Sequence, residues 1–151
     1  MSDPIRPILV INGPNLDMLG TRQPEIYGHD TLADVEALCH RTGADEGVSI
    51  DFRQSDSEAE IMGWIKRARG AMSGIVINPA GFTSTSIAIL DALLIFDGPI
   101  IEVHISPLFR RDSFRHLSYV SKAASAKIEG CGISGYAFAI TRLAALAKQA
   151  A

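Results

Sequence analysis

The stretch ILVINGPNLDMLGTRQPEIYG, residues 8–28, begins with four consecutive apolar side chains and continues as a polar loop that contains glycine and proline. A run of this kind indicates a strand that is buried on both faces, as in a parallel sheet covered by helices. The loop places side-chain amides, Arg22 and Tyr27 after the carboxyl end of that strand. Ligands bind at this edge in open α/β sheets. The stretch therefore predicts both a fold class and the position of a functional site.

The rest of the chain alternates between short apolar runs and segments with helical periodicity. Candidate strands cover residues 7–12, 48–53, 74–78, 99–105 and 125–129. This alternation predicts an α/β fold with a doubly wound, five-stranded parallel sheet of order 2-1-3-4-5, flanked by helices on both faces and joined by right-handed crossovers. No linker divides the 151 residues, so we expect a single domain, residues 1–151.

The helical segments carry recognisable start signals. Thr31 is a plausible N-cap for the first helix, and Ser55 or Asp56 for the second. The third, residues 84–96, is apolar nearly all round, so we expect it to be buried in the fold or in a subunit contact. The last covers residues 135–148.

Composition excludes several classes of partner. The net charge of −3 and a pI near 5.7 offer no basic face for nucleic acid or anionic lipid. The N-terminus has no apolar signal core, and the longest apolar stretch, residues 87–96, is too short to span a membrane. Cys39 and Cys131 lie in apolar contexts and are expected to be buried, reduced thiols. We therefore expect a cytoplasmic protein without nucleic acid or membrane partners.

Two further polar clusters follow predicted strands near the point where the strand order reverses. Residues 78–86 form one, although their hydroxyls can also cap the next helix. Residues 102–106 form the other. Within it, Glu102 and His104 are two apart on a strand and point to the same face. A carboxylate there favours the charged imidazolium and orients it, as a general acid requires, whereas a structural histidine is the alternative.

Two features leave alternatives open when taken alone. A free tyrosine is a poor base because its pKa is about 10, but a guanidinium held close favours the phenolate. Arg22 and Tyr27 can form such a pair, or they can belong to a solvated surface loop. Residues 109–119 are the most basic segment, which can bind a small anion such as a carboxylate or remain a solvated charged loop.

Taken together, these segments resemble the type II 3-dehydroquinate dehydratases over nearly the whole chain. The matching motifs are NGPN at 12–15, LGTRQP at 19–24 with Tyr27-Gly28, NPAG at 78–81, Asp91-Ala92, EVHIS at 102–106 and RDSFR at 111–115. The resemblance implies a flavodoxin-like fold, a dodecamer built from trimers, and no metal or cofactor. It implies a lyase that removes water from 3-dehydroquinate to give 3-dehydroshikimate, under a lid formed by residues 20–28.

The resemblance also implies a catalytic role for five side chains. Tyr27, as phenolate, abstracts a proton from C2 of the substrate, and Arg22 keeps Tyr27 ionised. Asn15 helps to hold a water that stabilises the resulting enolate. His104 protonates the departing C1 hydroxyl, and Glu102 supports His104.

A second set of residues is implied to bind the substrate. Backbone amides of Ile105 and Ser106 hold the carboxylate, together with the Ser106 hydroxyl. Arg115 and Asn78 meet ring hydroxyls, and Asp91 reaches in from a neighbouring subunit. The complete set is Asn78, Gly81, Ser84, Asp91, Ile105, Ser106, Arg111 and Arg115.

The chain departs from the family pattern at positions that hold the substrate. Ser84 stands where the family usually has a histidine and is too short to make the same ring contact without a bridging water. Pro107 replaces an asparagine and removes a backbone donor, and Leu90 replaces an arginine just before Asp91. We expect preserved elimination chemistry with altered ring recognition. The alternatives are a paralogue that performs the same elimination on a different hydroxy-keto acid and a non-catalytic flavodoxin-like binding module.

Overall fold

Five short segments form the parallel sheet at the centre of the fold. They are β1 (Ile8–Asn12), β2 (Ile50–Gln54), β3 (Gly74–Asn78), β4 (Ile100–His104) and β5 (Ala126–Glu129). The computed structural model describes residues 3–151 and gives the order β2-β1-β3-β4-β5, with every pair parallel. The doubly wound, flavodoxin-like sheet predicted from the alternation is thereby confirmed.

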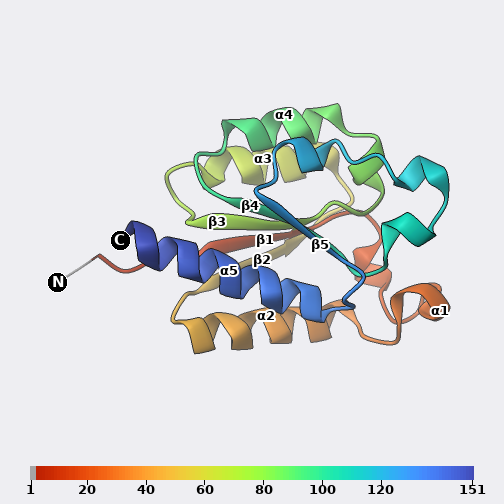
Figure 1. The fold of residues 1–151 in the computed structure, drawn as a ribbon, viewed down its shortest axis with the longest axis horizontal. Coiled ribbons are helices and arrows are strands. Elements are labelled where there is room, and N and C mark those ends of the chain that lie inside the picture. Colours follow the sequence, from red (N-terminus) through yellow and green to blue (C-terminus); the bar gives the residue numbers. More distant parts are fainter. Residues whose placement is uncertain (1–2) are drawn as a thin grey trace.

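Helices cover both faces of the sheet. They are α1 (Pro24–Tyr27), α2 (Leu32–Glu46), α3 (Glu58–Ala68), α4 (Ile87–Ile95) and α5 (Ser134–Ala150). Figure 1 shows α3 and α4 on one face, α2 and α5 on the other. Among the described residues, no helix is long and apolar enough to cross a membrane.

Side chains of β1 alternate between the two halves of the core. Ile8 and Val10 pack with the residues under α2 and α5, whereas Leu9 and Ile11 pack with those under α3 and α4. All four are at most 1% exposed. Burying one such side chain contributes about 1.5–3 kcal/mol relative to leaving it exposed. The strand is therefore held from both sides, and the loop after it starts from a rigid point.

Side-chain caps begin α2, α3 and α4. Thr31 accepts a hydrogen bond from the Asp34 N–H over 3.2 Å, and the Asp34 carboxylate accepts one from the Thr31 N–H over 2.9 Å, which confirms Thr31 as the N-cap of α2. The cap of α3 is Ser57, whose hydroxyl accepts the N–H three residues later. The prediction of Ser55 or Asp56 was therefore wrong, because Ser55 instead accepts from the N–H of Ser57.

The predicted third helix, residues 84–96, is slightly shorter in the structure and covers Ile87–Ile95. Residues 80–84 form a 3₁₀ turn, and α4 begins after Ser86, whose hydroxyl accepts from the Ile89 N–H over 2.9 Å. One side of α4 is buried and the other is open to solvent in the single chain. The apolar residues on the open side are Ile87, Leu94 and Ile95, which are 50–61% exposed.

The two cysteines have different environments. Cys39 is buried on α2, and this burial raises the pKa of its thiol to about 12. Cys131 is exposed, so the expectation that it is buried was wrong. It lies in the turn between β5 and α5, flanked by Gly130 and Gly132, rather than on an inward face of either element.

Candidate active site

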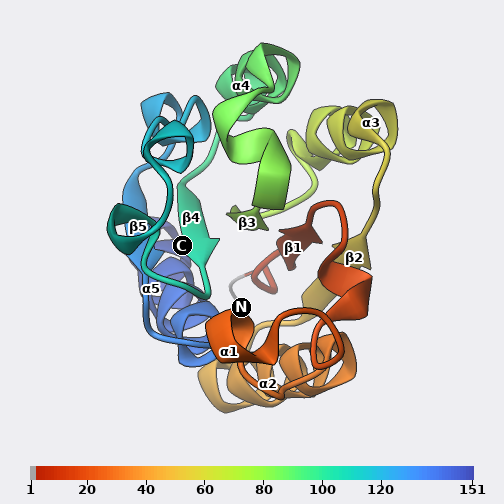
Figure 2. The same ribbon diagram turned by 90° about the vertical axis from the view of Figure 1, so that its right-hand side faces the viewer.

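Polar loops after β1, β3 and β4 meet at the carboxyl edge of the sheet. Figure 2 looks onto this edge, with α1 in front of it. A cavity of about 170 Å³ lies there, which suits a small ligand because pockets for drug-sized molecules are about 300–1,000 Å³. Its lining comprises Pro14, Asn15, Leu16, Met18, Leu19, Arg22, Tyr27, Asn78, Ala80, Gly81, His104, Ile105, Ser106, Leu108, Arg111 and Arg115.

A glycine brings the first two loops together. The N–H of Gly13 donates to the carbonyl of Asn78 over 2.8 Å. A Cβ on Gly13 would lie 2.4 Å from the carbonyl oxygen of Pro79, so any larger residue would push the loops apart. Two residues later, Asn15 adopts a left-handed conformation with φ 70°, which asparagine tolerates better than most residues. Its N–H donates to the Asp56 carboxylate over 3.0 Å, which anchors the loop that lines the cavity.

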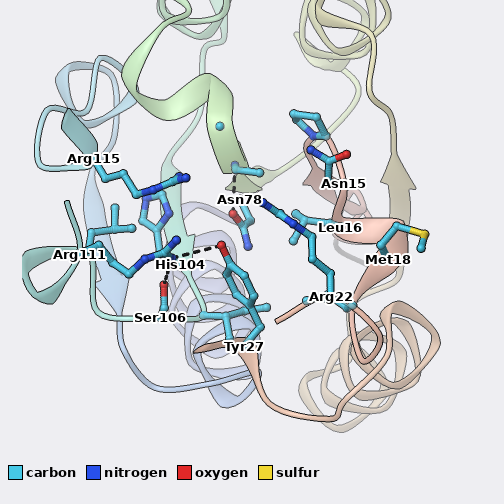
Figure 3. A pocket seen from close by; sticks show the side chains of 16 residues that line it. Asn15, Leu16, Met18, Arg22, Tyr27, Asn78, His104, Ser106, Arg111 and Arg115 are labelled. Atoms are coloured by element: carbon cyan, nitrogen blue, oxygen red, sulfur yellow. Dashed lines mark hydrogen bonds between the residues drawn. The ribbon is translucent and has the colours of Figure 1, made fainter. Parts of the chain in front are cut away.

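Tyr27 lies between two arginines. Arg111 donates one hydrogen bond to the Tyr27 phenol oxygen and another to the Ser106 hydroxyl, each 3.1 Å long (Figure 3). The guanidinium carbon of Arg111 is 5.3 Å from the centre of the Tyr27 ring, and that of Arg22 is 5.9 Å from it. Tyr27 is therefore held by one guanidinium through a hydrogen bond to its oxygen and has a second guanidinium near its ring.

Glu102 and His104 form a buried pair at the end of β4, only 0% and 4% exposed. The His104 ring nitrogen Nε2 is hydrogen-bonded to a Glu102 carboxylate oxygen. Ser118 and Ser121 donate to the same carboxylate over 2.9 and 2.5 Å, and Lys127 Nζ lies 3.9 Å away. Burial alone would raise the pKa of Glu102, but the hydrogen bonds from His104 and the two serines outweigh it and hold the pKa below its ordinary value. Glu102 is thus a carboxylate placed to fix the orientation of the His104 ring.

A second buried network lies beneath Asn78. The Tyr136 hydroxyl of α5 donates to Asn12 Oδ1 over 2.8 Å and accepts from Asn78 Nδ2 over 2.9 Å. Asn12 Nδ2 donates to the carbonyl of Arg53 over 3.0 Å, and Asn78 Oδ1 accepts from the N–H of Ala80 over 3.2 Å. Burial raises the pKa of Tyr136, so its hydroxyl stays a neutral donor. These contacts join the ends of β1 and β3.

Most of the residues predicted for the site line the cavity, but three do not. Glu102 lies behind His104, to which it is hydrogen-bonded. Ser84 donates to the carbonyl of Leu117 over 2.7 Å and lines an adjoining hollow. Asp91 is exposed on α4. The predicted residues that line the cavity are Asn15, Arg22, Tyr27, Asn78, Gly81, His104, Ile105, Ser106, Arg111 and Arg115.

Three supporting residues, Tyr136, Ser118 and Ser121, were not predicted from the sequence. Tyr136 lies four residues before Ile140 on the inward face of α5, so periodicity indicates that it is buried but does not identify its partners. Ser118 precedes the 3₁₀ turn Val120–Lys122 and Ser121 lies within it, so no local pattern predicts that both hydroxyls reach one carboxylate. Among residues 3–151, no group of three or more His, Cys, Asp or Glu side chains is arranged to hold a metal ion.

Comparisons of this chain with known proteins all identify the same family. A family model described as "Dehydroquinase class II" matches residues 6–144. The "3-dehydroquinate dehydratase" of Streptomyces avermitilis is 59% identical over 143 residues, covering 94% of this chain and 90% of the relative. That of Streptomyces coelicolor is 58% identical over 142 residues, covering 93% and 90%. Among solved structures, the type II dehydroquinase from Propionibacterium acnes has a TM-score of 0.90 at 44% identity, covering 95% of this chain and 99% of that one.

Proposed function

We propose that this chain, which belongs to the class II dehydroquinase family, is a hydro-lyase that dehydrates 3-dehydroquinate to 3-dehydroshikimate. The observation that carries the proposal is a phenol held by a guanidinium and an imidazole held by a buried carboxylate, both lining one small cavity. Elimination of water requires a base that removes a proton from carbon and an acid that protonates the departing hydroxyl group.

The first proposed step is removal of a proton from C2 of the substrate by the Tyr27 phenolate. This proton is acidic because the electron pair left behind is delocalised onto the neighbouring ketone as an enolate. Arg22 and Arg111 keep Tyr27 ionised, a role supported by their positions 5.9 and 5.3 Å from its ring centre. Asn15 holds the water that stabilises the enolate oxygen. The segment of residues 20–28 acts as a lid that brings Tyr27 to the substrate and excludes solvent.

In the second step the enolate collapses and the C1 hydroxyl leaves. His104, as imidazolium, gives its proton to that oxygen, so that the C1–O bond breaks, a C1–C2 double bond forms and one water departs. Glu102 orients the ring and favours its charged form. Phenolate becomes phenol and imidazolium becomes imidazole, so the net charge of the pair is the same before and after.

Substrate binding is assigned to the cationic and amide groups of the cavity. Ser106 and the backbone of Ile105 hold the carboxylate, and Asn78 meets a ring hydroxyl and the outgoing group. Arg115 meets another ring hydroxyl, a role supported by its buried Nε, which has no hydrogen-bond partner among the described residues. Asp91 reaches the site of a neighbouring chain, for which its exposed place on α4 is suited.

We also propose that the chain works in the cytoplasm as a dodecamer built from trimers. The support for assembly is the apolar face of α4, the helix that also carries Asp91, where Ile87, Leu94 and Ile95 are at least half exposed. Light scattering on the purified protein measures the mass directly. A monomer at working concentration would contradict the assembly and leave Asp91 without a site to complete.

A second candidate function is the same elimination on a different hydroxy-keto acid. It is favoured by one observation: the Ser84 hydroxyl donates to the Leu117 carbonyl and does not line the main cavity. The contact with the substrate ring that the family pattern predicts for residue 84 is then absent. A panel of related hydroxy-keto acids, assayed beside 3-dehydroquinate, separates the two candidates by their kcat/KM ratios.

The test of the leading proposal is a direct assay. Purified protein mixed with 3-dehydroquinate is expected to develop the ultraviolet absorbance of a conjugated enone. Tyr27→Phe is expected to abolish most of the rate, while Tyr119→Phe, a control that removes a phenol oxygen elsewhere, keeps it. Absence of turnover even at high substrate concentration would refute the proposal, and full activity in Tyr27→Phe would refute the assigned base.

A further inference from the structure

Three buried side chains form a continuous hydrogen-bonded network, and one of them, Asn78, lines the cavity. Asn12 and Asn78 are paired positions on β1 and β3, so they leave the sheet on the same face. Tyr136 reaches them from α5, 124 residues away from Asn12 and 58 from Asn78. All three are buried, at 0%, 4% and 0% exposure for Asn12, Asn78 and Tyr136.

The backbone groups at its two ends set the direction of every hydrogen bond in this three-residue network. A carbonyl only accepts, so the Arg53 carbonyl requires the NH₂ group of Asn12 and turns Oδ1 of Asn12 toward Tyr136. The Tyr136 hydroxyl must therefore donate to Asn12, and its oxygen is left to accept from the NH₂ group of Asn78. At the other end, the N–H of Ala80 requires Oδ1 of Asn78. Both ends agree on one orientation of the Asn78 amide.

We infer that Tyr136 is a positioning residue that fixes the Asn78 amide with one N–H directed at Tyr136 and the second N–H available to the ligand. The inference rests on the proposed function for its substrate, and it deepens the role of Asn78. Asn78 lines the cavity, and its Oδ1 is already engaged, so this amide offers a donor rather than an acceptor to the substrate. A donor suits a hydroxyl oxygen that accumulates negative charge as it leaves.

The competing explanation is that Tyr136 only fills the core. It packs in the same buried cluster as Ile140 and Leu143 of α5, so its removal would destabilise the fold in any case. The two explanations differ in what the hydroxyl does. A packing role resides in the ring, whereas the positioning role resides in one oxygen atom, which Tyr136→Phe removes while keeping the ring.

The experiment compares Tyr136→Phe with Ile140→Val, a control that trims the same helix and the same core cluster away from Asn78. With 3-dehydroquinate, Tyr136→Phe is expected to lower kcat about tenfold to a hundredfold with a smaller change in KM. Ile140→Val is expected to lower the Tm and to keep kcat within twofold. Equal kcat values for Tyr136→Phe and the native enzyme would overturn the inference.

A double-mutant cycle shows whether the effect passes through Asn78. In the Asn78→Ala background, measured at enzyme concentrations that detect residual turnover, adding Tyr136→Phe is expected to cost less than twofold. The same loss in both backgrounds would overturn the inference and indicate that Tyr136 acts independently of Asn78.

A crystal structure of Tyr136→Phe supplies a readout that does not depend on turnover. The Asn78 amide is expected to rotate or to become disordered, whereas the Asn12 bond to the Arg53 carbonyl remains. An unchanged Asn78 side chain would overturn the inference. If the native enzyme fails to dehydrate 3-dehydroquinate, the proposed function fails while the crystal structure still decides the positioning role.

Discussion

Arg111 donates a hydrogen bond to the phenol oxygen of Tyr27 over 3.1 Å, joining two segments that lie 84 residues apart. The same guanidinium also reaches Ser106, so one side chain connects the loop after β1 with the end of β4. The sequence suggested Arg22 as the cation beside Tyr27, and both arginines lie within 6 Å of its ring centre. The position of the loop that carries Tyr27 and the charge of the Tyr27 phenol are therefore expected to depend on Arg111 as well as on Arg22.

Arg111→Ala should lower kcat/KM about tenfold to a hundredfold, because a hydrogen bond from a charged donor contributes about 1.5–3 kcal/mol. Steady-state kinetics with 3-dehydroquinate measure the effect. Arg110→Ala is the matched control, since Arg110 is an exposed neighbour that does not line the cavity. Equal losses in both variants would show that general positive charge, rather than the contact with Tyr27, is responsible.

Glu102→Gln should reduce kcat strongly and KM little, because the amide keeps the shape of the side chain but no longer favours a charged His104. Ser118→Ala and Ser121→Ala each remove one hydrogen-bond donor to the Glu102 carboxylate and should lower kcat by less than Glu102→Gln does. The comparison is again one of steady-state rates. A glutamine variant with native kcat would remove Glu102 from the catalytic machinery.

The stability of the native protein should fall in acid because of Glu102. Its pKa is lower when folded than its ordinary 4.5, so the unfolded chain binds more protons between the two values. The contribution of ionised Glu102 to the stability of the fold is fully present above about pH 4.5. It is lost as the pH falls through the pKa that Glu102 has in the folded protein. Urea unfolding across this range should show a smaller pH dependence in Glu102→Gln than in the native protein. The exposed Glu60→Gln should keep the native slope.

Ser84→His should raise kcat/KM for 3-dehydroquinate about tenfold if substrate recognition has weakened at this position, since a restored ring contact is worth about 1 kcal/mol or more. Ser84→Ala is the control, because it removes the bond to the Leu117 carbonyl without adding a ring contact. A loss of activity in Ser84→His would show that the site is adapted to serine.

Gly13→Ala should destabilise the fold by about 1–3 kcal/mol, because its Cβ would lie 2.4 Å from the Pro79 carbonyl oxygen. The free energy of unfolding in urea measures this. Gly81→Ala is the stability control, as no heavy atom lies within 4 Å of a Cβ placed there. Similar destabilisation at both positions would contradict the close approach of the two loops.

Much of the architecture could be predicted because its signals are local. The five apolar runs, the Thr31 cap and the inward faces of α2, α3 and α5 follow from neighbouring residues. Errors arose where local signals competed. Three adjacent polar residues could each cap α3, and hydrogen-bond geometry selected Ser57. Cys131 has apolar neighbours in the sequence, which favoured a buried position, but it lies in the turn after β5 and is exposed.

The sequence by itself determined the strand order, the edge at which the site lies and the residue types that line it, because periodicity and motif spacing depend on neighbours along the chain. Only the tertiary structure decided which of these residues touch. Arg111 meets Tyr27, two serines hold Glu102, and Tyr136 sets the amide of Asn78. Such contacts depend on how helices and loops pack across the sheet, at separations of up to 124 residues, and no local pattern carries that distance information.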